Sequence, residues 1–155
     1  MTRNYRLYGR NAGFFSSLSV TSILILINIM AFVFFLVLLS SETTSLDFVA
    51  IKPSNILQGN YLWTFITSMF MHAGFFHLLV NMLSLLFIGS FIERILGKRR
   101  YFWFYIASGL FAGFFFVLSS MIFVGDIDTF AVGASGALFG IAGLMVILTP
   151  NMPLY

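Results

Sequence analysis

Long apolar runs without charge are the feature that most constrains the fold of this chain. Residues 18–39 contain no charged side chain and are predominantly apolar. At about 1.5 Å per residue, a helix of this length crosses a hydrocarbon core of about 30 Å. A secretory signal peptide also places an apolar run after basic residues, but that run usually has only about 7–15 residues. We therefore predict a first transmembrane helix at residues 18–39.

Three further apolar segments, at residues 72–91, 101–124 and 135–148, give the same pattern. The chain is 60% hydrophobic and only 8% charged, a composition that a soluble domain of 155 residues could not bury in one core. The predicted fold class is all-α. We expect a polytopic membrane helical bundle with four transmembrane helices, forming a single domain over residues 1–155 and embedded in the lipid bilayer.

The segment between the first two predicted helices, residues 40–71, mixes polar and apolar side chains. It is too polar to span a membrane and too apolar for an ordinary water-exposed loop. We expect it to lie at the membrane interface, with Tyr61 and Trp63 as aromatic anchors.

The charged residues predict an orientation. If the N-terminus is cytoplasmic, only Lys52 of the eight Lys and Arg residues falls on the outer side. The other basic residues then flank the helices on the cytoplasmic side, as the positive-inside rule requires: Arg3, Arg6, Arg10, Arg94, Lys98, Arg99 and Arg100. Four of the five acidic residues fall outside: Glu42, Asp47, Asp126 and Asp128. The net charge of +3 is thus a topology signal, and we expect no nucleic-acid partner.

Three polar residues are predicted to lie at a similar depth in the membrane. We count upward from the inner helix ends near Glu93 and Pro150 at about 1.5 Å per residue. Ser135 then lies roughly 22 Å above the cytoplasmic interface, His77 about 24 Å and Asn81 about 18 Å. All three fall inside a hydrocarbon core of about 30 Å.

The fourth predicted helix is too short to reach the outer surface. Residues 128–134 must therefore enter the membrane as non-helical backbone, which is tolerated only where protein or a water-filled cavity surrounds it. This segment leads into Gly133-Ala134-Ser135-Gly136. The pattern alone fits a nucleophilic serine, but it favours the other interpretation, small residues that permit close helix packing.

His77 and Asn81 are separated by four residues and project from one face of a helix. They could act as interhelical hydrogen-bonding groups worth about 1 kcal/mol. They could also converge on a developing oxyanion beside Ser135, where each donor stabilises the transition state. His72, at the entrance of the helix and near water, is expected to be a structural hydrogen-bonding residue.

Glycines recur at helical spacing in the third and fourth predicted helices. Gly136, Gly140 and Gly143 are expected to let the fourth helix approach its neighbours closely and so bring Ser135 within reach of another helix. Gly109 and Gly113 form a second GxxxG pattern, for which packing is a sufficient explanation.

Two of these motifs resemble those of a known family. The segment from His72 through His77 to Asn81 resembles the HxxxxHxxxN of rhomboid intramembrane serine proteases, and Gly133–Gly136 resembles their GxSG. Glu93-Arg94 followed by Gly97 is also similar to the family's second-helix end. The resemblance runs from about residue 63 to residue 143, with both motifs in the right order.

The resemblance implies a fold and an activity. It implies that Ser135 is the nucleophile and that His77, Asn81 and the backbone N–H of Ser135 stabilise the oxyanion, with Gly133, Gly136 and His72 in supporting roles. It implies an intramembrane serine endopeptidase whose substrate is itself a transmembrane helix, cut near its outer end. No cofactor and no metal are expected.

The sequence departs from the family pattern at three places. The family's Trp-Arg in the first loop is Trp63-Thr64 here, and an aromatic residue that is often tyrosine is Phe139. The family's general-base histidine lies on a sixth helix, whereas this sequence stops at Tyr155, before a fifth. We therefore expect four helices of a six-helix rhomboid fold, with no general base in this chain and little activity on its own.

Two other functions remain as alternatives. A catalytically inactive rhomboid-like protein would bind transmembrane helices without cutting them, but it has little need of an intact GxSG. A transporter or channel subunit would line its path with polar residues. For that function we would expect charged groups within the spans or paired broken helices, and the sequence has neither.

Overall fold

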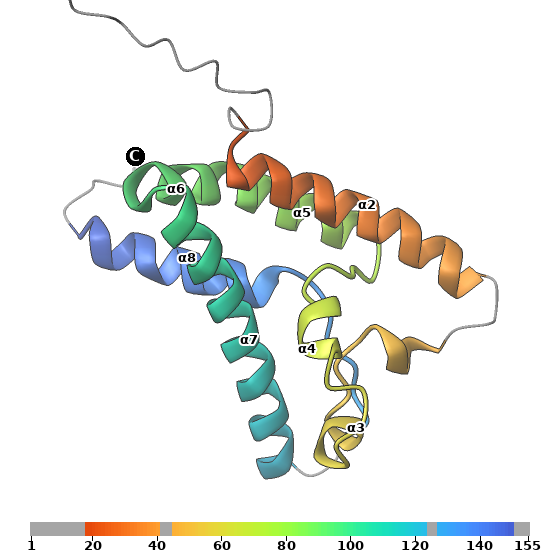
Figure 1. The fold of residues 1–155 in the computed structure, drawn as a ribbon. Coiled ribbons are helices and arrows are strands. Elements are labelled where there is room, and N and C mark those ends of the chain that lie inside the picture. Colours follow the sequence, from red (N-terminus) through yellow and green to blue (C-terminus); the bar gives the residue numbers. More distant parts are fainter. Residues whose placement is uncertain (1–17, 41–44, 124–126, 151–155) are drawn as a thin grey trace, which may run out of the picture.

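The computed structural model describes residues 18–40, 45–123 and 127–150, which form a bundle of helices (Figure 1). Within this described part, three helical stretches are long and apolar enough to cross a membrane: Val20–Ser40, Phe75–Leu96 and Lys98–Ile122. The fourth apolar helix, Ser135–Leu148, has only 14 residues. The predicted all-α membrane bundle is confirmed.

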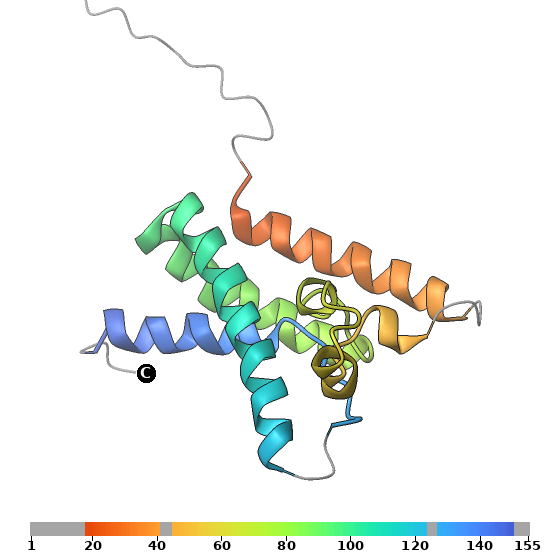
Figure 2. The same cartoon turned by 60° about the horizontal axis from the view of Figure 1, so that its bottom comes forward.

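The first long helix is α2 (Val20–Ser40), the third is α7 (Lys98–Ile122) and the fourth is α8 (Ser135–Leu148). The second is a continuous run of three segments: α5 (Phe75–Ser84), the π-helical turn η2 (Leu85–Gly89) and α6 (Ser90–Leu96). Three short helices lie between α2 and α5: η1 (Leu46–Phe48), α3 (Pro53–Leu57) and α4 (Thr64–Thr67). Both views place α2 beside α5 and show α7 crossing α8 (Figures 1 and 2).

The predicted bounds of the first and fourth helices agree with the structure to within two residues. The second helix, predicted at 72–91, instead begins at Phe75 and continues to Leu96. Gly74 before it is fully extended, so residues 72–74 stay outside the helix. The third helix, predicted from residue 101, begins at Lys98, because long basic side chains are good helix formers that carry their charge out to water.

The buried carboxylate of Glu93 explains why the second helix can continue past its predicted end. Its Oε1 accepts from the backbone N–H of Val20 at 2.7 Å. Its Oε2 accepts from the backbone N–H and the hydroxyl of Thr21 at 2.9 and 2.8 Å. A carboxylate at a helix N-terminus satisfies free N–H groups and complements the helix dipole. The start of α2 is thereby fixed to α6.

The core lies where α2, η2, α6, α7 and α8 meet. Its fully buried side chains include Leu85, Ile92, Tyr101, Tyr105 and Ile141. The π-helical turn η2 lies in this region, between the helix segment that carries His77 and the one that carries Glu93.

Small residues bring α7 and α8 into close contact. A Cβ on Gly136 would lie 2.5 Å from Cβ of Ala112, and a Cβ on Gly140 would collide with Ser108. The predicted close approach is confirmed for these two glycines. It is wrong for Gly143, which has no atom within 4 Å of its Cβ position.

The GxxxG of α7 contacts the segment between α2 and α5, which includes α4 and is called the first loop below. Gly109 packs against Met69, while Gly113 packs against Ile51 and Phe65. The parts of the first loop that contain Ile51, Phe65 and Met69 thus pack on α7. The expected anchor Trp63 is 52% exposed and forms an aromatic cluster with Tyr61 and Phe48.

Candidate active site

The backbone that leads into α8 is non-helical, as predicted, and ends in a left-handed glycine. Gly133 has a φ of 114°, which residues with a Cβ rarely adopt. Its N–H donates to the carbonyl oxygen of Ser68 at 2.8 Å, and the following Ala134 is fully buried. Ser135 is the first residue of α8. The first N–H groups of a helix have no intrahelical partner, so the Ser135 N–H is available to a ligand.

The first loop holds this segment in place. Ile51 and Ala131 exchange two backbone hydrogen bonds of 3.1 and 2.9 Å, forming an isolated antiparallel bridge. The N–H of Ser54 donates to the carbonyl of Ile127 at 2.8 Å. Backbone inserted into a membrane bundle must have its polar groups paired, and the first loop provides the partners.

An ion pair adds to this connection. Lys52 Nζ lies 3.2 Å from Asp128 Oδ1, and Ser54 Oγ donates to the same oxygen at 2.8 Å. The Ser54 hydrogen bond and Lys52 together lower the pKa of Asp128. The sequence placed Lys52 and Asp128 on the same side of the membrane, but nothing in it indicated that they pair.

Asp47 extends the ion pair into a small network. Lys52 Nζ lies 4.0 Å from Asp47 Oδ1. Hydrogen bonds from Ser45 and Asn55 to the Asp47 carboxylate lower its pKa. The network lies at the opposite end of α2 from Glu93, because Glu93 contacts the first turn of α2 whereas the residues near Asp47 follow its last turn.

His77 lies directly against Gly133. A Cβ on Gly133 would be 2.7 Å from Cε1 and 2.8 Å from Nε2 of the imidazole, and 3.7 Å from Nδ2 of Asn81. The glycine therefore satisfies two requirements at once, a positive φ and close contact with an imidazole ring. This contact brings the two sequence motifs together.

Ser135, His77 and Asn81 line one cavity of about 270 Å³ between α5 and α8. The remaining lining residues are mostly apolar: Val80, Ser84, Ile88, Leu138, Phe139 and Ala142. Asn81 is 5% exposed, whereas His77 and Ser135 are half-buried. The ring of Phe139, at the position where the resemblance leads one to expect tyrosine, is 79% exposed beside them.

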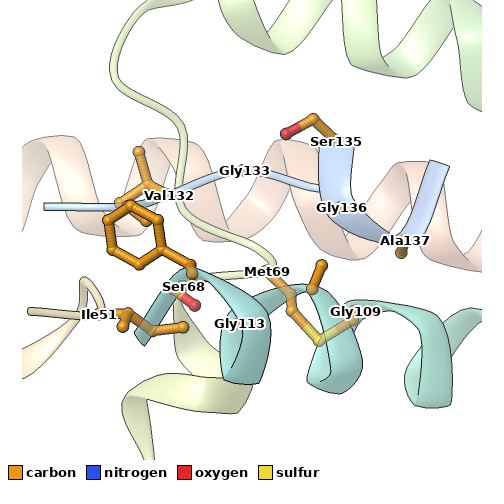
Figure 3. Close-up of a pocket in the computed structure, with 13 residues that line it drawn as sticks. Ile51, Ser68, Met69, Gly109, Gly113, Val132, Gly133, Ser135, Gly136 and Ala137 are labelled. Atoms are coloured by element: carbon orange, nitrogen blue, oxygen red, sulfur yellow. The ribbon is translucent and has the colours of Figure 1, made fainter. Parts of the chain in front are cut away.

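A second cavity of about 170 Å³ lies on the other side of the Gly133–Gly136 segment. It is lined by residues of the first loop, α7 and the start of α8, and Ser135 also borders it (Figure 3). Figure 3 shows the Ser135 hydroxyl directed away from α7. Ser135 thus borders both cavities.

The hydrogen bonds of the polar residues leave donors available. Asn81 Nδ2 donates to the backbone carbonyl of His77 at 3.0 Å, which leaves its second N–H unused. Asn81 and the His77 ring do not hydrogen-bond to each other in the described part of the chain. There, the Ser135 hydroxyl also forms no side-chain hydrogen bond, so neither histidine is in place as its base.

His72 was expected to lie near water, but it is buried, at 4% exposure. Its Nδ1 lies 3.3 Å from the carbonyl oxygen of Phe70, and its Nε2 has no hydrogen-bond partner. The His72 and His77 rings meet edge to face, with centroids 5.1 Å apart. The two rings are therefore in direct packing contact. Across residues 18–40, 45–123 and 127–150 there is no group of three or more His, Cys, Asp or Glu residues that could hold a metal.

Comparison with known proteins identifies a family and several relatives. The family model of the Rhomboid domain matches residues 59–154. RHOMBOID-like protein 1 of Arabidopsis thaliana is 42% identical over 97 residues, covering 63% of this chain and 23% of the relative. RHOMBOID-like protein 2 of the same plant is 38% identical over 101 residues, covering 65% of this chain and 30% of the relative.

A third relative bears a different name. Inactive RHOMBOID-like protein 8 of Arabidopsis thaliana is 36% identical over 101 residues, covering 64% of this chain and 27% of the relative. The chain therefore spans about a quarter to a third of the length of these relatives. The residues matched by the Rhomboid model, 59–154, include both His77 and Gly133. This chain belongs to the rhomboid family.

Proposed function

We propose that this chain contributes the nucleophile and the oxyanion site of an intramembrane serine endopeptidase. Ser135 is the nucleophile, and His77, Asn81 and the Ser135 N–H stabilise the oxyanion. The substrate is a transmembrane helix cut near its outer end. The N-terminus is cytoplasmic, which places the Lys52 and Asp128 end of the bundle outside.

The observation that carries the proposal is the cavity lined by Ser135, His77 and Asn81. These side chains come from two helices that are connected by more than forty residues, and the cavity is otherwise mostly apolar. A polar cluster in an apolar membrane bundle is costly unless it serves a function. Packing alone accounts for Gly136 and Gly140, but not for a serine, an imidazole and an amide beside one cavity.

The proposed reaction is acyl transfer. The Ser135 oxygen attacks a peptide carbonyl carbon, and the carbonyl oxygen becomes an oxyanion in the tetrahedral intermediate. The free N–H of Asn81, a His77 ring nitrogen and the unpaired Ser135 N–H supply hydrogen bonds to that oxygen. In a site with little water, such preoriented donors stabilise the developing charge strongly.

A serine hydroxyl also requires a base in hydrogen-bond contact. His77 is assigned to the oxyanion, and His72 packs behind it with one nitrogen beside the Phe70 carbonyl. The proposal therefore assigns the base to a histidine on a further helix. The exposed ring of Phe139 beside the cavity is where such a helix would pack.

The second candidate is an inactive rhomboid that binds transmembrane helices. The relative named as inactive makes this a real alternative, and the Ser135 hydroxyl without a base is compatible with it. The intact Gly-Ala-Ser-Gly sequence favours the peptidase.

A serine-reactive fluorophosphonate distinguishes the two functions. The 155-residue chain should not be labelled, because Ser135 has no base. A version extended by two helices that carry a histidine should be labelled, and its Ser135→Ala variant should not. Absence of labelling in the extended version would favour the inactive rhomboid. Rapid labelling of the 155-residue chain would reassign His72 or His77 as the base.

A further inference from the structure

A third cavity lies at the opposite end of the bundle from the Lys52 and Asp128 pair. It has a volume of about 340 Å³ and lies between the start of α2 and the turn from α6 to α7. Its lining residues are Ser19, Ser90, Glu93, Arg94, Gly97 and Lys98. It shares none of them with the cavities that border Ser135.

The turn at Gly97 gives this cavity its shape. Gly97 has a φ of 78° and ends α6, and α7 begins at the next residue. The left-handed turn places Arg94 and Lys98 on the same cavity although they belong to different helices. A Cβ on Gly97 would meet no atom within 4 Å, so the glycine is required by its conformation and not by crowding.

The charge in this cavity is mainly positive. The Glu93 carboxylate is 7% exposed and accepts three hydrogen bonds from the first turn of α2, which compensate its charge. Arg94 is exposed and forms no ion pair with any carboxylate of the described residues. Lys98 also lines the cavity, and its Nζ donates to the carbonyl of Leu18 at 2.7 Å.

The cavity is also located at a membrane boundary. It lies where α2 begins, where the Phe75–Leu96 helix ends and where the Lys98–Ile122 helix begins. The ends of three spanning helices meet there, so the cavity is at headgroup depth whichever way the protein is oriented. Exposed apolar side chains, including Ile23 and Ile95, lie within one turn of these ends and offer a surface to acyl chains.

We propose that this cavity binds the headgroup of an anionic glycerophospholipid. Arg94 forms hydrogen bonds with the phosphate, Lys98 contributes positive charge, and the hydroxyls of Ser19 and Ser90 contact the remaining headgroup oxygens. Arginine suits phosphate because two of its N–H groups can bind two oxygens at once. Basic pockets between the ends of transmembrane helices bind anionic headgroups in this way. The site is independent of the peptidase proposal.

The test compares lipids in nanodiscs that contain the 155-residue chain. Phosphatidylglycerol, added as a minor component to phosphatidylcholine, should bind and raise the midpoint of thermal unfolding. Arg94→Gln should weaken the binding about fivefold, the factor expected when one basic residue is removed near an anionic surface. Arg94→Lys keeps the charge but loses the two-point contact. Its affinity for phosphatidylglycerol should therefore lie between those of the unsubstituted chain and Arg94→Gln.

The matched control is Arg99→Gln, which removes the same charge from a neighbouring exposed residue outside the cavity. It should weaken binding less than Arg94→Gln. Equal losses in the two variants would overturn the proposal in favour of diffuse attraction to the basic cluster. So would equal stabilisation by inorganic phosphate in phosphatidylcholine nanodiscs, because the site would then recognise free phosphate and not a lipid.

Discussion

The backbone of Gly133 lies against the imidazole of His77 so closely that a Cβ on Gly133 would be 2.7 Å from Cε1 and 2.8 Å from Nε2. This contact joins the HxxxxHxxxN segment of α5 to the residues that precede Ser135. The geometry of the proposed oxyanion site therefore depends on a residue that itself contributes no side chain.

Gly133→Ala should disrupt this contact. Alanine is strained at a φ of 114° and would push the His77 ring away, so we expect a loss of about 1–3 kcal/mol in the free energy of unfolding. In the version extended by two helices, fluorophosphonate labelling of Ser135 should also fall.

The matched control is Gly143→Ala, because a Cβ there meets no atom within 4 Å. In the 155-residue chain it should be neutral or stabilise α8 by up to about 1 kcal/mol. Equal destabilisation by both substitutions would contradict this account.

Asn81→Ala tests the oxyanion assignment. Removal of one oxyanion donor typically reduces turnover by about 10²–10³. We expect this reduction in the extended version, measured with a transmembrane peptide substrate, while the midpoint of thermal unfolding changes little. Ser84→Ala is the control, because Ser84 lines the same cavity but its hydroxyl bonds to the Val80 carbonyl of its own helix. A large fall in the unfolding midpoint of Asn81→Ala would instead favour a role in helix packing.

Glu93→Gln tests the connection between α2 and α6. The carboxylate accepts three hydrogen bonds, and an amide presents N–H groups where one of its oxygens was. Since unsatisfied buried donors cost about 1–3 kcal/mol each, the free energy of unfolding should fall by at least about that amount. Denaturation in mixed micelles measures the change. Thr21→Val, which removes only the hydroxyl donor, should cost less, and the reverse order would refute the capping role of Glu93.

The ion pair of Lys52 and Asp128 predicts a dependence on pH. The pKa values of Asp47 and Asp128 are lowered in the folded protein, so their stabilising effect is complete above the usual aspartate pKa of about 3.9. It is lost as the pH falls through the lowered values. In that acidic range, protection of the Ala131 and Gly133 N–H groups from hydrogen exchange should decrease. Lys52→Met should reduce their protection already at neutral pH, and unchanged protection in that variant would show that the ion pair does not hold the segment.

The sequence predicted best those elements whose limits are set locally. The fourth helix was predicted with the ends that the structure shows, because Gly133 precedes it and Pro150 follows it. The second helix was misplaced at its C-terminal end, since the partners of Glu93 are supplied by α2 and cannot be inferred from neighbouring residues. The π-helical turn at Leu85–Gly89 gave no signal at all.

The candidate site shows the same division. Spacing predicted that His77, Asn81 and Ser135 lie close together, and the three residues line one cavity. The burial of His72 and the pairing of Gly133 with the Ser68 carbonyl depend on how the first loop packs over α7. Such packing involves residues far apart in the chain, and no local pattern encodes it.

The pairing of Glu93 with the start of α2 also has a consequence for the order of synthesis. Thr21 and Glu93 are 72 residues apart. At a synthesis rate of about 5–20 residues per second, α2 is therefore made several seconds before Glu93, whose carboxylate caps it. During that interval its first N–H groups must bind water or lipid headgroups. The first helix can therefore adopt its final position only after the second has been translated, which makes insertion of this protein a joint event of two helices.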